Sequence, residues 1–117
     1  MFSPQTEWTP PDELKDLSQA KQIAIDLETR DPNLTTRGSG SVRDDGEIVG
    51  IAVAVEGWSG YFPIAHEGGG NIDKKIVLNW FKDVLQTPAT KIFHNAMYDV
   101  SWIRALGFKI EDALLIQ

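Results

Sequence analysis

The chain has 117 residues and a formal net charge of −6, with 42% hydrophobic and 24% charged residues. That length fits one domain, and the composition excludes an intrinsically disordered or fibrous protein. No cysteine is present, which excludes a disulfide scaffold and any metal site with thiolate ligands.

The longest apolar run, residues 48–55, is far shorter than the roughly 20 residues that a membrane-spanning helix needs. The first residues contain no basic segment followed by an apolar one, so we expect no secretory signal and a cytoplasmic protein. The acidic balance argues against a protein that coats nucleic acid by charge alone. It is compatible with an enzyme that holds cations between its carboxylates and a phosphate.

The first half of the chain predicts an arm and three strands. Residues 1–20 are proline-rich and predict an N-terminal arm, followed by a domain over residues 21–117. Residues 21–27 alternate in the manner of a strand, and residues 29–47 predict a long loop. The apolar run 48–55 predicts a strand buried on both faces, and a hairpin turn leads into a third strand at 58–64.

The second half predicts two helices with a strand between them. Apolar residues recur at helical spacing from Ile76 to Leu85, with Asp73 or Asn71 as the cap. Residues 90–93 predict a strand, and Asn95 is expected to cap a helix over 96–106. The order predicts an α/β domain with a mixed sheet: three antiparallel strands, a crossover helix, a fourth, parallel strand and another helix. Because the chain stops on apolar residues, we expect a C-terminally incomplete domain.

Three carboxylates are candidates for chemistry. Asp26 and Glu28 lie two residues apart at the end of the first strand, so their side chains point to the same face. The alternative is a strand end that passes into a polar loop with both side chains in solvent. On a helical wheel Asp99 falls within the buried stripe of the second helix, where a carboxylate is costly unless paired or metal-bound. The alternative is that Asp99 caps its own helix or pairs with Arg104.

Such a set predicts a site for hard cations. Magnesium and manganese prefer oxygen ligands, and water and substrate phosphate complete their coordination. Two such ions about 3.5–4 Å apart can activate water and stabilise the leaving oxygen of a phosphodiester.

Two motifs carry a resemblance to a known family. Residues 26–29 (DLET) resemble the first motif, D-x-E-T, of the DEDD 3′–5′ exonucleases, and residues 94–99 (HNAMYD) resemble their second. The stretches EIVGIAVAV, YFPIAHEGGGN and KIFHNAMYDVSWIRALG are similar to the N-terminal proofreading domain of phage-type family A DNA polymerases. The resemblance extends from about residue 21 to the end.

The resemblance implies a ribonuclease-H-like fold with the first strand central, in a protein of the bacterial or phage-infected host cytoplasm. It implies two Mg²⁺ or Mn²⁺ ions, with Asp26 bridging both, Glu28 on the water-activating ion and Asp99 on the second. Thr29 and Asn95 would lie beside the terminal nucleotides of a single-stranded DNA 3′ end, and Tyr98 would line the same cleft.

The chain departs from the family pattern beyond the second motif. The third motif, a Tyr or His followed by a fourth metal-binding Asp, is missing after Gln117, as is the polymerase domain. Asp112-Ala113 stands where relatives usually have Asp-Thr, a position that is not a metal ligand in the family.

Other residues have two interpretations each. Arg30, Arg37 and Arg43 could guide a DNA strand across the site, or belong to a solvated loop whose acidic residues offset them. His66 and His94 stand at strand ends, where a histidine is more often structural than a metal ligand.

The leading hypothesis is a metal-dependent 3′–5′ exonuclease that proofreads for an attached polymerase. The alternative is a non-hydrolytic, truncated module that binds single-stranded DNA or associates with another chain, including a second copy, through its C-terminal edge. An exoribonuclease of the same superfamily is a third hypothesis, since the two motifs barely separate RNA from DNA.

Overall fold

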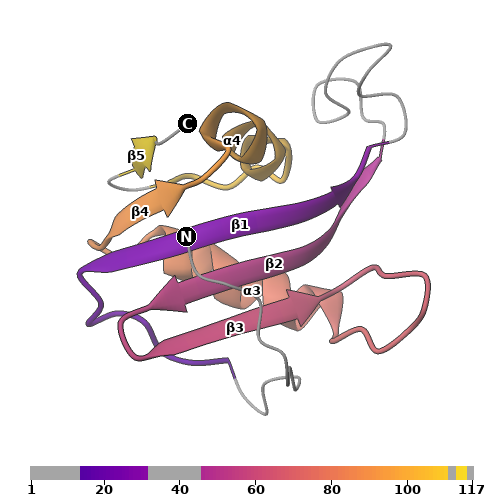
Figure 1. Cartoon of the computed structure of the whole chain (residues 1–117), viewed down its shortest axis with the longest axis horizontal. Helices are drawn as coiled ribbons and strands as arrows, with labels where there is room; N and C mark the ends of the chain where they lie inside the picture. Colours follow the sequence, from indigo (N-terminus) through magenta and orange to yellow (C-terminus); the bar gives the residue numbers. More distant parts are fainter. Residues whose placement is uncertain (1–13, 32–45, 111–112, 116–117) are drawn as a thin grey trace.

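A central five-stranded mixed sheet organises the chain (Figure 1). The structure, a computed structural model, describes residues 14–31, 46–110 and 113–115. Within these residues the elements follow the order β1 (Gln22–Arg30), β2 (Glu47–Val55), β3 (Trp58–Pro63), α3 (Lys74–Leu85), β4 (Thr90–Phe93), α4 (Ala96–Ala105) and β5 (Ala113–Leu115). No helix in this part of the chain is long and apolar enough to span a membrane.

The strands lie in the order β3-β2-β1-β4-β5, so β1 is central, as the family resemblance implies. β1, β2 and β3 pair antiparallel, whereas β4 pairs parallel with β1 and β5 parallel with β4. The predicted mixed sheet with a crossover helix is therefore confirmed. β5 was not predicted, because a three-residue strand gives no periodic signal and is recognised only through its pairing with β4.

The apolar residues of β1 alternate onto the face of the sheet that α3 covers. Ile23, Ile25 and Leu27 are buried there, and α3 lies behind β1, β2 and β3 in Figure 1. On the same side Phe62 of β3 contacts Trp80 of α3, with ring centroids 4.6 Å apart. Burial on two faces, as predicted for β2, holds for residues 48–51 but not for Ala52 and Ala54, which are only half-buried.

The predicted long loop 29–47 is shorter than expected, because both flanking strands extend into it. After a register shift at Glu28/Thr29, Thr29 pairs with Ile48 and Arg30 with Glu47. The polar composition of these positions does not end the strands, since Arg30 and Glu47 also form an ion pair across them at 2.7 Å. Residues 32–45 lie outside the described part of the chain.

Helix α3 begins at a true cap. The Asp73 carboxylate accepts hydrogen bonds from the backbone N–H groups of Lys75 and Ile76, at 2.9 and 3.2 Å. Asn71, the other candidate, is bonded to His66 instead. Val77, Phe81, Val84 and Leu85 are buried. Ile76, assigned to the apolar face by its spacing, is 56% exposed, because the helix turns this position away from the sheet.

The end of the N-terminal arm packs on this layer. Leu17 is buried in the core, and the indole N–H of Trp80 donates to the Lys15 carbonyl at 2.7 Å. Residues 14–20 are therefore attached to the domain that comes after them.

Candidate active site

The central strand presents two of the predicted carboxylates. Asp26 and Glu28 lie on the face of β1 opposite to Ile25 and Leu27, as strand geometry requires. Asp26 is half-buried, whereas the Glu28 side chain is 57% exposed. Burial raises the pKa of Asp26, the nearby His94 lowers it, and the charge of Glu28 raises it again.

Helix α4 brings the third carboxylate to Asp26. Asp99 is 1% exposed and lies in the buried stripe with Ala96, Val100 and Ile103, as the helical wheel predicts. Burial, followed by the negative charge of Asp26, raises the pKa of Asp99 to about 7, and a hydrogen bond with the Leu27 backbone opposes the rise. The Oδ2 atom of Asp99 is buried and has no hydrogen-bond partner among the described residues.

The alternative in which Asp99 pairs with Arg104 does not explain why Asp99 is buried. Arg104 is exposed while Asp99 is buried, and no ion pair joins the two residues in the described part of the chain.

Asn95 stands at the N-cap position of α4, but its side chain makes no capping hydrogen bond. The exposed Asn95 carboxamide and the exposed Met97 side chain therefore lie on the surface at the start of the helix.

Glu28 is bonded to Tyr61, which the sequence analysis does not single out, and lies near His66, which that analysis interprets as structural rather than as a metal ligand. Tyr61 of β3 donates its hydroxyl proton to Glu28 Oε2 at 2.7 Å, and His66 Nε2 lies 2.5 Å from the same phenol oxygen. Within the described ranges, no group of three or more Asp, Glu or His side chains is gathered closely enough to hold a metal ion. The site thus consists of the Asp26–Asp99 pair and, two residues along β1, the bonded Glu28.

The donor set nevertheless suits a hard divalent cation. All three predicted ligands offer carboxylate oxygens, which magnesium and manganese prefer. One of these oxygens, Asp99 Oδ2, is buried without a hydrogen bond to satisfy it. A cation beside Asp99 and Asp26 would supply the positive charge that this pair lacks.

A second polar cluster joins two of the predicted nucleotide-binding residues. The Thr29 hydroxyl lies 2.6 Å from the Tyr98 hydroxyl, which donates to Asp31 Oδ2 at 3.0 Å. Burial is the main cause that raises the pKa of Tyr98, so the phenol stays protonated at neutral pH. Thr29 and Tyr98, 69 positions apart, are therefore brought together at the end of β1.

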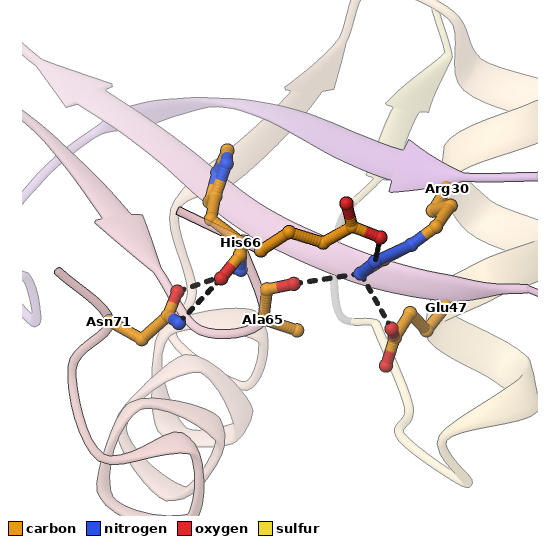
Figure 2. A network of polar contacts seen from close by, with 6 residues as sticks. Arg30, Glu47, Ala65, His66 and Asn71 are labelled. Carbon is orange, nitrogen blue, oxygen red and sulfur yellow. Dashed lines mark hydrogen bonds and ion pairs between the residues drawn. The ribbon is translucent and has the colours of Figure 1, made fainter. Parts of the chain in front are cut away.

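Arg30 holds the loop that connects β3 to α3 (Figure 2). Its guanidinium donates to Glu47 at 2.7 Å, to the Ala65 carbonyl at 2.8 Å and to Glu67 at 3.3 Å. Its side chain remains 36% exposed, and the Glu67 partner is 85% exposed. Arg37, the other predicted phosphate-binding arginine, lies outside the described residues, as does Arg43.

The comparisons with known proteins point to DNA polymerases. No model of a protein family matches the chain. The chain is 37% identical over 111 residues to a DNA-directed DNA polymerase of Pseudomonas phage M6, which covers 91% of this chain and 17% of that polymerase. It is thus homologous to part of a phage DNA polymerase and spans about a sixth of that protein's length.

A solved structure shares the fold. It is the POL domain of Pol1 from M. smegmatis in complex with DNA primer-template and dNTP, with a TM-score of 0.52 and 10% sequence identity. The match covers 85% of this chain and 15% of that one. At this identity the likeness concerns the fold alone.

Proposed function

We propose that this chain is a 3′–5′ exonuclease domain of the proofreading type, with a ribonuclease-H-like fold, from a DNA polymerase. The observation that carries the proposal is the Asp26–Asp99 pair, in which a buried carboxyl with an unsatisfied oxygen lies close enough to a second carboxylate for that charge to raise its pKa. Such a pair is unfavourable unless a proton or a cation neutralises it. The homology to a phage DNA polymerase supports the proposal, because a polymerase provides the DNA on which such a site would act.

Asp26, Glu28 and Asp99 would hold Mg²⁺ or Mn²⁺, as the donor chemistry favours. Two such ions supply, when bound, the positive charge that makes water nucleophilic near neutral pH and stabilises the leaving 3′ oxygen. The three carboxylates supply the negative charge of the site. Because Asp99 is buried, its own carboxyl group is shielded from bulk water.

The residues around the pair would bind the 3′ end of a single DNA strand. Thr29 and Tyr98 place two hydroxyl groups at the end of β1, and Asn95 offers a carboxamide that its own helix does not use. The Asn95 amide can donate to sugar or phosphate oxygens, and the two hydroxyls can accept from water or the strand, or donate once they leave their bonds to each other and to Asp31. Such contacts position a strand without reading its sequence. Arg30 and Arg37 are proposed as further phosphate contacts.

The test is degradation of a 5′-labelled single-stranded DNA oligonucleotide in Mg²⁺ or Mn²⁺. We expect a ladder that shortens from the 3′ end and disappears in Asp26→Ala. Asp83→Ala, which removes an exposed carboxylate on α3, is the matched control and should cleave at the wild-type rate. Full activity in Asp26→Ala would overturn the assignment.

Three further measurements separate the other hypotheses. Binding of the oligonucleotide without cleavage would favour a non-hydrolytic module. The observation that supports this alternative is that the described residues contain no group of three or more Asp, Glu or His side chains close enough to hold a metal ion. Faster loss of an RNA oligonucleotide would favour an exoribonuclease. Sedimentation that depends on protein concentration would favour self-association.

A further inference from the structure

Tyr61 reaches across a whole strand to contact Glu28. Tyr61 is on β3 and Glu28 on β1, with β2 between them. Neighbouring strands lie about 4.8 Å apart, so the side chains of Tyr61 and Glu28 together have to span roughly twice that distance above β2. The residue of β2 paired with Glu28 is Gly50.

Gly50 is what makes the crossing possible. A Cβ atom at position 50 would lie 1.8 Å from the Tyr61 hydroxyl oxygen and 2.3 Å from its Cζ, far inside any permitted contact. Any other residue there would push the phenol off the strand. The need for glycine is therefore steric and comes from Tyr61.

The direction of the hydrogen bonds follows from counting protons. A phenol carries one proton, and that of Tyr61 points to Glu28 Oε2. The 2.5 Å contact with His66 is then a bond that Nε2–H donates to the phenol oxygen.

Hydrogen bonds hold the backbone at His66 and at the residue before it. Its backbone N–H donates to the Asn71 side-chain oxygen at 2.8 Å, and the Asn71 amide donates back to the His66 carbonyl at 2.9 Å. The preceding residue, Ala65, is bonded to Arg30 through its carbonyl (Figure 2). The imidazole thus stands on an anchored loop, and its ring meets that of Tyr61 edge-on with centroids 5.8 Å apart.

We propose that Tyr61, supported by His66 and made possible by Gly50, is a positioning residue that fixes the carboxylate of Glu28 for cation binding; this rests on the proposed function. An exposed glutamate on a strand would otherwise sample several rotamers. Both contacts with Tyr61 and His66 use Oε2, so they do not occupy Oε1. Partners that orient a ligand typically change metal affinity about 10–100-fold when removed.

Two variants disrupt the contact by different routes. Tyr61→Phe removes the hydroxyl and keeps the ring, while Gly50→Ala keeps the phenol and displaces it. Gly68→Ala is the control, because a Cβ at Gly68 meets nothing within 4 Å and its backbone is not in the left-handed region. All four 117-residue chains are compared, with thermal unfolding to establish that each is folded.

The first readout needs no metal. NMR coupling constants of Glu28 should indicate one χ1 rotamer in the wild type and Gly68→Ala, and averaged rotamers in Tyr61→Phe and Gly50→Ala. Averaged rotamers in the wild type, or one retained rotamer in both variants, would overturn the inference and leave the proposed function intact.

The second readout is calorimetric titration with Mn²⁺ alone. We expect affinity about tenfold weaker in Tyr61→Phe and Gly50→Ala, at unchanged melting temperature, and wild-type affinity in Gly68→Ala. Unchanged affinity in the two variants would overturn the positioning role. If the wild type binds no Mn²⁺, the proposed metal site fails, and the rotamer measurement still decides whether Tyr61 fixes Glu28.

Discussion

The carboxyl of Asp99, on α4, lies near enough to Asp26, on the central strand, that the charge of Asp26 opposes its ionisation. Burial adds to this effect and is the larger cause. A fold that places two carboxylates in this way is strained at neutral pH unless a proton or a cation intervenes. Stability should therefore respond both to pH and to divalent metal.

In EDTA, the wild type should lose stability as the pH rises. The pKa of Asp99 is about 7 in the folded chain and 3.8 in the reference state, so the folded state binds the proton more tightly. The stabilisation is complete below the lower value and is lost as the pH rises through about 7. Between about pH 5 and pH 8 the free energy of unfolding should fall by on the order of 3 kcal/mol more than in Asp99→Asn. Urea titrations of both proteins measure this, and parallel pH profiles would contradict it.

Divalent metal should reverse that loss. Ligand binding to the folded state stabilises it by about 2.7 kcal/mol at a free concentration one hundred times Kd. At pH 8, Mn²⁺ should therefore raise the melting temperature of the wild type and have a much smaller effect on Asp99→Asn. Asp83→Asn, altered at an exposed carboxylate of α3, should respond as the wild type does. An equal Mn²⁺ response in Asp99→Asn would argue against a site at Asp99.

The two apolar positions of α3 with opposite exposure give a test of the packing. Phe81 is fully buried against the sheet, whereas Ile76 is 56% exposed. Phe81→Ala should lower the free energy of unfolding by about 3–5 kcal/mol, because it removes contacts and leaves a cavity. Ile76→Ala should change it by less than about 0.5 kcal/mol. Comparable losses in the two variants, in denaturant titrations, would place Ile76 on the packed face after all.

The residues at the N-cap positions of α3 and α4 should differ in their contribution to stability. Asp73 accepts two backbone hydrogen bonds, while the Asn95 side chain accepts none from its helix. Asp73→Ala should cost about 1 kcal/mol. Asn95→Ala should leave stability nearly unchanged and, under the proposed function, weaken binding of a single-stranded oligonucleotide. Chemical unfolding and fluorescence anisotropy measure the two effects, and a large stability loss in Asn95→Ala would assign that residue to capping instead.

The local patterns predict most of the fold because they report which face of an element is buried. The alternation of Ile23 and Ile25 predicts the first strand, and the helical wheel places Asp99 in the buried stripe of α4. Both signals lie within a few residues of sequence. The antiparallel pairing of the first three strands and the parallel pairing of β4 follow from the order of these elements along the chain, whereas β5 does not.

What the patterns miss depends on contacts between distant residues. The extension of β1 to Arg30 comes from pairing with Glu47, and the local sequence around residue 30 does not predict a strand there. The contact of Tyr61 with Glu28 depends on a register in which Gly50 lies between them. The glycine within the apolar run 48–55 is the one signal in the sequence that indicates a close approach at that point.

The parallel pairing of β4 with β1 determines where α4 begins, and therefore where Asp99 lies relative to Asp26. The last paired residues are Ile25 and Phe93, and only two residues separate Phe93 from the start of α4. An α-helix turns by about 100° per residue, so one residue inserted between Ala96 and Asp99 would turn the Asp99 side chain by about 100° away from Ala96, which is buried on the same face. The spacing between Phe93 and Asp99 is thus as restrictive as the identity of the carboxylate itself.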